Sequence, residues 1–237
     1  MCRELVDPEE LRVEELDNVP CGPDRVRVRI WASGVNYVDA LFVQGQYQIK
    51  PPLPFIPGSE IAGELTEVGP EVEGWAVGDR VMASVGLGGF ADEIVLLADQ
   101  LTRIPDRLSF GQAATMGQSY CTAWFTLTRR TVLRPEDWVA IFGAAGGVGL
   151  AMLDVARSFG AHTVAVASSP EKLQLAIERN ANAVIDSSDS GADGATMRAR
   201  IREVTDGGAD IVIDPVGGTL TEEGLRGLRE GGRGAAG

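Results

Sequence analysis

Hydrophobic and polar residues follow two different periods along the 237-residue chain. Up to about residue 105, apolar and polar positions alternate in short segments at 25–31, 60–68 and 80–84, which is typical of half-buried strands. Glycine-containing turns separate these segments, and the prolines of Pro51–Gly58 predict an extended loop. The first part of the chain therefore predicts a partly open β-barrel.

From about residue 109 the period lengthens. Ser109 and Gln112 form a capping-box pattern, which predicts a helix over 113–127. Beyond it, strands alternate with helices. We expect strands at 138–142, 163–167, 183–185 and 210–213, and helices at about 147–159, from Ser169–Pro170 onward, at about 195–205 and from about 221. This order predicts an α/β domain with a doubly wound parallel sheet.

A glycine-rich turn follows the first of these strands, with Gly143, Gly146 and Gly149 at three-residue spacing. A strand that turns tightly into a helix leaves free backbone N–H groups at the positive end of the helix dipole, which suits a pyrophosphate. Leu150 and Ala151 follow the turn where a P-loop would carry Lys and Ser or Thr, so a P-loop ATPase is excluded.

The second strand indicates which dinucleotide is bound. It ends at Ala167 without the acidic residue that usually accepts the ribose 2′-OH of NAD, and Ser168, Ser169 and Lys172 follow. Two hydroxyls and an ammonium at a helix N-terminus favour a 2′-phosphate, so we predict NADPH over NADH. A second glycine turn, Asp214–Gly218, is expected to face the same crevice at the carboxyl ends of the strands.

The amino-acid composition limits which molecules the protein is expected to bind. The net charge of −13 disfavours nucleic acid and anionic membrane surfaces. Apolar runs are too short for a membrane span and the N-terminus has no signal-peptide profile, so we expect a cytoplasmic protein. The three cysteines are scattered and His162 is the single histidine, so we expect no metal site.

The motifs then match a known family in order and spacing. The chain resembles the zinc-independent quinone oxidoreductase branch, the ζ-crystallin-like proteins, of the medium-chain dehydrogenase/reductase superfamily. The matching motifs are Gly34–Asp39, Gly45–Tyr47, Pro57–Gly63, Val77–Val81, Ala144–Gly149 and Asp214–Gly218.

The resemblance implies a GroES-like catalytic domain at 1–108, a Rossmann NADP(H)-binding domain at 109–237, and an active site in the cleft between them. Zinc-dependent members carry a cysteine at the position of Asn36 and a histidine at that of Ser59. Without a metal to stabilise an alkoxide, hydride addition from NADPH to a small-molecule quinone or an activated C=C bond is expected.

The resemblance also assigns site residues. It implies that Asn36 donates its amide hydrogens to a substrate carbonyl, that Tyr47 stacks on a ring or donates its hydroxyl, and that Thr122 touches the nicotinamide amide. The expected cofactor-binding residues are Gly143, Ala145, Gly146, Gly147, Val148, Gly149, Ser168, Ser169, Lys172, Val216 and Gly217.

In the family, Gly231–Gly232–Arg233 would lead into a fifth parallel strand, but this chain stops at Gly234–Gly237, so the last two Rossmann strands are expected to be missing. The fourth strand would then expose an unpaired edge. The interface strand of the homodimers formed by full-length relatives would be missing too. Two alternatives stay open, namely an enoyl reductase of the same superfamily and a truncated, non-catalytic nucleotide-binding protein.

Overall fold

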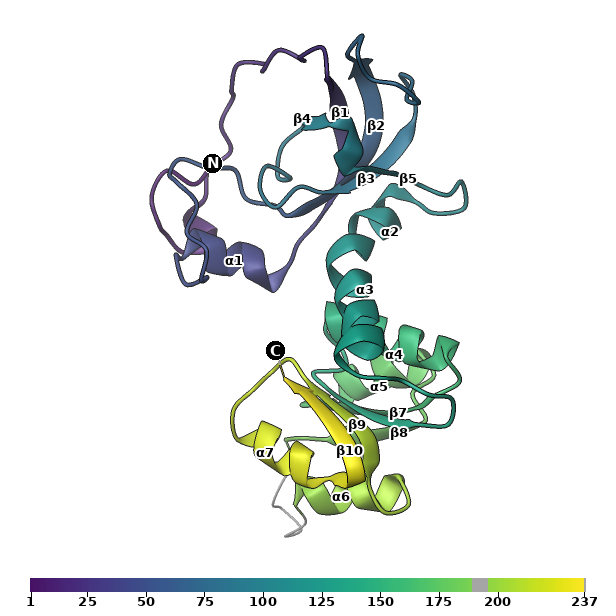
Figure 1. The fold of residues 1–237 in the computed structure, drawn as a ribbon. Helices are drawn as coiled ribbons and strands as arrows, with labels where there is room; N and C mark the ends of the chain where they lie inside the picture. The colour runs from purple at the N-terminus through teal and green to yellow at the C-terminus, as the bar shows by residue number, and fades with distance from the viewer. Residues whose placement is uncertain (189–195, 237) are drawn as a thin grey trace. The chain divides into compact units, whose positions relative to one another are not determined.

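The computed structural model of the chain describes residues 1–188 and 196–236. The chain divides into two compact units, Met1–Gln118 and Ser119–Gly237. The first contains an antiparallel sheet and the second a parallel one (Figure 1). No helix in the described ranges is both long and apolar enough to cross a membrane.

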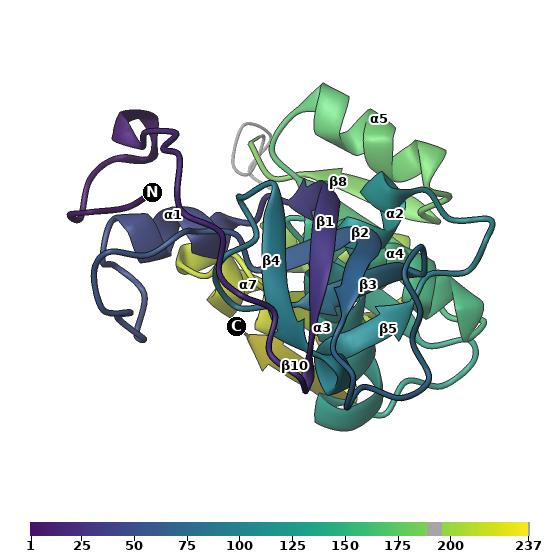
Figure 2. The same ribbon diagram turned by 90° about the horizontal axis from the view of Figure 1, so that it is seen from above.

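The sheet of the first unit has the strand order β4-β1-β2-β3-β5, visible side by side in Figure 2. The strands are β1 (Arg25–Gly34), β2 (Glu60–Val68), β3 (Arg80–Ser84), β4 (Glu93–Leu97) and β5 (Leu101–Arg103). Val26 and Val28 of β1 are fully buried with Ile61 and Leu65 of β2, as the alternating pattern predicts.

This sheet is curled. Its two edge strands, β4 and β5, are joined by the single turn η2 (Ala98–Gln100). A flat five-stranded sheet would hold its edges about 19 Å apart at about 4.8 Å per strand, and a three-residue 3₁₀ turn rises only about 6 Å. The short connection therefore requires the edges to approach, and the partly open barrel predicted from the sequence is confirmed.

The first unit also contains short helical segments, and the helix α3 (Met116–Phe125) begins at its end. A short 3₁₀ turn, η1 (Pro8–Glu10), lies near the N-terminus, α1 (Tyr37–Val43) follows β1, and α2 (Phe110–Ala114) begins at the predicted Ser109 cap. The continuous helix expected over 113–127 is wrong. It is divided at Thr115, whose hydroxyl bonds the Gln112 carbonyl, and resumes as α3 (Met116–Phe125), followed by a π-helical turn, η3 (Thr126–Arg130).

The parallel sheet of the second unit has the order β10-β9-β6-β7-β8. In chain order its elements are β6 (Trp138–Phe142), α4 (Gly147–Ser158), β7 (His162–Ala167), α5 (Pro170–Glu178), β8 (Ala183–Asp186), α6 (Met197–Val204), β9 (Ala209–Asp214), α7 (Thr219–Arg226) and β10 (Leu228–Ala236). Position 195, where a helix was expected to begin, lies outside the described residues.

Both faces of this sheet are covered, as expected of a doubly wound fold. Along β6, Val139 and Ile141 belong to a core shared with α4, whereas Ala140 and Phe142 belong to a second core shared with α6. Strands buried on both faces read as continuous apolar runs, and β6 is one.

The expected unpaired edge at the fourth strand is wrong. A fifth strand, β10, pairs in parallel with β9, placing Arg233–Ala236 opposite Ile211–Asp214. The pairing is irregular between Leu228 and Arg233, where Gly231 adopts a φ of +77°. The fifth strand that was expected to be missing is therefore present, and the glycines at 231 and 232 form an irregularity within it.

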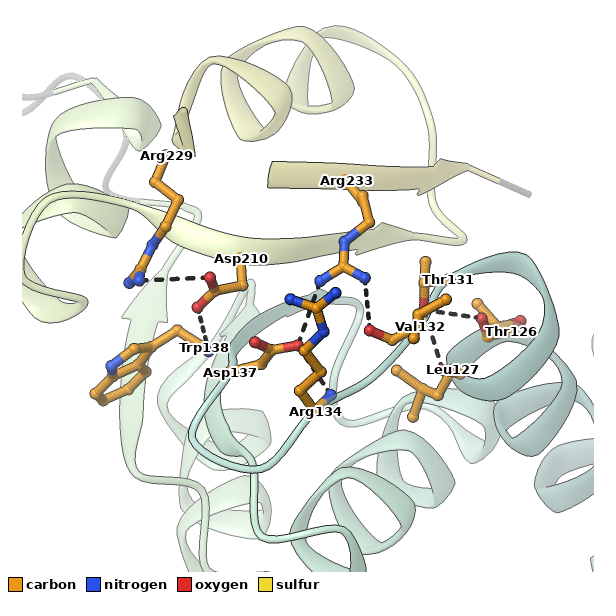
Figure 3. Close-up of polar contacts among 10 residues, drawn as sticks. All are labelled: Thr126, Leu127, Thr131, Val132, Arg134, Asp137, Trp138, Asp210, Arg229 and Arg233. Atoms are coloured by element: carbon orange, nitrogen blue, oxygen red, sulfur yellow. Dashed lines mark hydrogen bonds and ion pairs between the residues drawn. The ribbon is translucent and has the colours of Figure 1, made fainter. Parts of the chain in front are cut away.

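Two arginines of β10 form hydrogen bonds and ion pairs with neighbouring segments of the second unit (Figure 3). Arg233 donates to the Val132 carbonyl and lies 3.4 Å from the Asp137 carboxylate. Arg229 lies 3.4 Å from Asp210, whose other oxygen accepts the backbone N–H of Trp138 at 2.8 Å. The strand is therefore bound to the sheet by side chains as well as by its backbone.

Candidate functional site

The glycine turn before α4 has the geometry of an anion cradle. Gly143 adopts a φ of +60°, which a residue with a side chain rarely does, and Gly146 is the N-cap of the helix. As in any α-helix, the first-turn N–H groups of Gly147 and Val148 have no intrahelical acceptor, and the glycine N-cap supplies no side chain to accept them. These donors and the helix dipole point to a phosphate at this end of α4.

The three glycines of the motif serve different purposes. A Cβ at Gly149 would collide with the Gly143 carbonyl oxygen and lie 2.6 Å from Ala144 Cα, so glycine there permits close packing of α4 on the turn. A Cβ at Gly146 would meet only the Gly143 oxygen, at 3.4 Å. Packing therefore does not require glycine at 146, and the open backbone there leaves room for a ligand to approach.

The second glycine turn lies against the first. A Cβ on Gly143 would lie 2.8 Å from Cγ2 of Val216, so the two predicted cofactor segments meet at the carboxyl ends of β6 and β9. The turn is organised by Asp214, which is buried and accepts the N–H groups of Val216 and Gly217 at 2.9 and 3.0 Å. Sequence reasoning quoted Asp214 within the motif but missed this role.

The predicted 2′-phosphate residues gather at the start of α5. Lys172 Nζ lies 3.3 Å from the exposed Ser168 hydroxyl, whereas the Ser169 hydroxyl is used as the N-cap of the helix. Glu171 shares this turn, and hydrogen bonds to its carboxylate from its own backbone N–H and from Ser169 lower its pKa. A carboxylate thus shares the first turn of α5 with Lys172, and the sequence reasoning overlooked it.

The remaining predicted residue of the second unit, Thr122, is exposed on α3. Its neighbour Ala123 is fully buried in the core shared with α4. The helix therefore holds Thr122 in a fixed and accessible place in this unit.

In the first unit, the structure brings Asn36 together with Ser59 and Glu60. Asn36 precedes α1, and its Nδ2 lies 2.8 Å from Glu60 Oε1 and 3.4 Å from Ser59 Oγ. Glu60 is 2% exposed, and its second oxygen accepts the backbone N–H of Gln118 at 2.8 Å. Glu60 was quoted only as part of a motif. The signal for its role lies in Gly34 and Gly117, where a Cβ would press on its carboxylate.

Asp39 completes this polar cluster. It is buried, its Oδ2 accepts the backbone N–H of Asn36 at 2.8 Å, and its Oδ1 has no hydrogen-bond partner among the described residues. Burial raises the pKa of Asp39, and the hydrogen bond from Asn36 opposes the shift. Tyr47 is not part of the cluster, because its half-buried ring packs on Phe42 at a centroid distance of 4.8 Å.

The cluster does not fit zinc. Asn36 and Ser59 are poor zinc ligands, and both oxygens of Glu60 already accept hydrogen bonds. Within residues 1–188 and 196–236, no group of three or more His, Cys, Asp or Glu residues could hold a metal ion.

Comparison with known proteins identifies the class. Residues 22–106 match the family described as "Alcohol dehydrogenase GroES-like domain", and residues 147–236 match "Zinc-binding dehydrogenase". The chain belongs to the medium-chain dehydrogenase/reductase superfamily, which combines a GroES-like and a Rossmann domain.

Within that superfamily, several relatives are named quinone oxidoreductase or quinone oxidoreductase-like. The chain is 39% identical over 234 residues to quinone oxidoreductase-like protein 2 of Bos taurus, covering 98% of this chain and 65% of the relative's length. A mycobacterial protein solved in complex with NADPH is 30% identical with a TM-score of 0.87, covering 99% of this chain and 71% of that one. The CurK enoyl reductase is 26% identical with a TM-score of 0.85, covering 96% and 70%.

Proposed function

We propose that the chain belongs to a zinc-independent oxidoreductase that uses NADPH to reduce a quinone or a related α,β-unsaturated carbonyl compound. The observation that carries the proposal is the α4 turn, in which Gly146 exposes backbone donors without being required by packing. The name of the bovine relative and the NADPH complex of the mycobacterial protein support the choice of substrate and cofactor.

In this proposal the second domain, residues 109–237, holds the cofactor. Gly147 and Val148 would donate to the pyrophosphate, and Ser168 and Lys172 would hold the 2′-phosphate. Glu171 opposes that phosphate, so Lys172 carries the preference for NADPH. When bound, NADPH supplies the hydride.

The first domain, residues 1–108, would supply the residues that bind substrate. Because Asn36, Ser59 and Glu60 do not fit zinc, no metal polarises the substrate carbonyl in this proposal. A conjugated carbonyl delocalises the incoming negative charge, so protein hydrogen bonds are sufficient to stabilise it. Simple alcohols lack this conjugation and are expected to be poor substrates.

The similarity to the CurK enoyl reductase favours a second candidate, reduction of an acyl thioester enone. NADPH oxidation at 340 nm with a panel of quinones, simple enones and enoyl thioesters separates the candidates. Turnover of quinones supports the proposal. Turnover restricted to thioesters supports the second candidate, and NADPH binding without any turnover supports a non-catalytic nucleotide-binding protein.

A further inference from the structure

The side-chain amide of Asn36 has a fixed orientation in the first unit. Its Nδ2 faces two oxygens, Oε1 of Glu60 at 2.8 Å and Oγ of Ser59 at 3.4 Å. A carboxylate oxygen accepts hydrogen bonds and does not donate them. Turning the amide over would place two acceptors 2.8 Å apart, so Glu60 determines which end of the amide points inward.

Glu60 is itself held from its other side. Its Oε2 accepts the backbone N–H of Gln118, in the first turn of α3, where the helix dipole favours a negative charge. Gly34 and Gly117 leave the space that the carboxylate fills, because a Cβ at Gly34 would overlap Oε1 and one at Gly117 would lie 3.2 Å from Oε2. The carboxylate is thus fixed by two separate segments of chain, 34–36 and 117–118.

With Nδ2 of Asn36 facing Glu60 and Ser59, the other end of the amide, Oδ1, is the end left to face a ligand. Asn36 precedes α1, but its side chain makes no capping hydrogen bond to that helix. The residue is partly exposed, whereas Ser59 and Glu60 are 6% and 2% exposed. A ligand that reaches Asn36 therefore meets Oδ1 and not the amide hydrogens.

From this geometry we infer that Asn36 acts on its ligand as a hydrogen-bond acceptor, and that Glu60 is the positioning residue that sets this polarity. The inference rests on the proposed function and names its substrate class, quinones or enones that carry a hydroxyl or N–H beside the reacting carbonyl. Asn36 then does not donate to that carbonyl. The donor to that carbonyl is then a different group.

An exchange of the two side chains tests the polarity. In Glu60→Gln, the new amide must accept the Gln118 N–H with its oxygen, so its nitrogen faces Asn36 and forces Asn36 to turn its oxygen inward. In the double variant Asn36→Asp with Glu60→Gln, the new glutamine donates to the new aspartate. The hydrogen bond is restored with reversed polarity, the net charge is unchanged, and an acceptor oxygen again faces the ligand.

The probes are 2-hydroxymethyl-3-methyl-1,4-naphthoquinone and its methoxymethyl analogue, which lacks the donor hydrogen. Substituents at both ring positions hinder addition of thiols such as the exposed Cys121. The wild type is expected to prefer the hydroxymethyl compound by about two- to tenfold in kcat/KM, the value of one hydrogen bond. Glu60→Gln should lose the preference and the double variant should regain it. Glu64→Gln, a charge-matched change on the same strand, should keep it.

A preference that survives Glu60→Gln, or that the double variant fails to restore while remaining folded by circular dichroism, overturns the inference. The ¹⁵N-edited NMR spectrum gives a readout without turnover. The Asn36 side-chain amide signals should move in Glu60→Gln and not in Glu64→Gln, and unchanged signals also overturn it. If no quinone is reduced, the proposed function fails, and NMR titration with the two probes still decides the polarity of Asn36.

Discussion

Two glycines of the α4 turn, Gly146 and Gly149, are expected to respond in opposite ways to the same added methyl group. In Gly149→Ala the new Cβ would overlap the Gly143 carbonyl oxygen and lie 2.6 and 2.8 Å from backbone atoms of Ala144. Backbone cannot swing aside, so the helix must shift. Overpacking of this kind costs about 1–3 kcal/mol, and the better helix propensity of alanine returns up to about 1 kcal/mol. A net loss of about 1–2 kcal/mol is expected.

Gly146→Ala places its Cβ 3.4 Å from the Gly143 oxygen, at a backbone conformation (φ −77°, ψ 168°) that alanine adopts freely. The poorer N-cap costs about 0.5 kcal/mol of unfolding free energy. The methyl group points into the proposed pyrophosphate position and would remove at least one charge-assisted hydrogen bond. That loss of about 1.5–3 kcal/mol weakens NADPH binding by about 10- to 150-fold.

Urea unfolding gives the stability of the three proteins, and titration of NADPH fluorescence gives the dissociation constants. The reasoning predicts that Gly146→Ala loses affinity at nearly wild-type stability, whereas Gly149→Ala loses stability. An NADPH dissociation constant of Gly146→Ala within twofold of the wild type would refute the placement of the pyrophosphate at this helix.

Three further changes test other parts of the structure. Arg233→Met removes the donors to the Val132 carbonyl and to Asp137, so about 1–2 kcal/mol of unfolding free energy should be lost and amide exchange in β10 should accelerate; unchanged exchange would contradict the fastening role. Lys172→Ala should weaken NADPH about two- to tenfold and leave NADH binding unchanged, as fluorescence titration would show, and an equal loss for both cofactors would remove Lys172 from the 2′-phosphate site. Burial raises the pKa of Asp39 in the folded state, so its contribution to stability is complete below the unfolded pKa and is lost as the pH rises through the folded pKa. Relative to Asp39→Asn, the wild type should therefore lose stability between about pH 4 and about pH 7, as measured by urea unfolding. The opposite trend would contradict the raised pKa.

Elements with a strong local pattern could be predicted to the residue. The segments at 60–68, 80–84 and 138–142 are β2, β3 and β6 at their observed bounds. In β3 burial alternates along the strand, in β2 the first four residues are all buried, and in β6 a continuous apolar run decides. The α5 helix likewise begins at the predicted serine and proline, because a cap is a local interaction.

β10 could not be predicted, because its stability comes from distant partners. Gly231, Gly232 and Gly234 have low strand propensity, yet the strand pairs with β9 and Arg233 reaches Val132 and Asp137, about a hundred positions earlier. Pairing and side-chain contacts at such separations leave no local pattern.

In the candidate site too, local features could be predicted from the sequence and long-range contacts could not. The glycine turn before α4 is contiguous in sequence, so its spacing predicted the structure that Gly143, Gly146 and Gly149 form. The role of Glu60 on β2 depends on Gly34 and Asn36 in one segment and on Gln118 in another, far along the chain. No single motif contains that information, so the orientation of the Asn36 amide emerged only from the structure.

The contact between Gly143 and Val216 has a consequence for how sequences of this kind can vary. A Cβ at 143 would lie 2.8 Å from Cγ2 of Val216, closer than packing allows, although 73 positions separate the two residues. Relatives that carry a larger residue at the first position are therefore expected to carry a smaller one at the second. Asparagine is the natural substitute at the first position, because it tolerates a positive φ. The two turns would then vary as a pair, and neither could be transplanted into another member of the superfamily without the other.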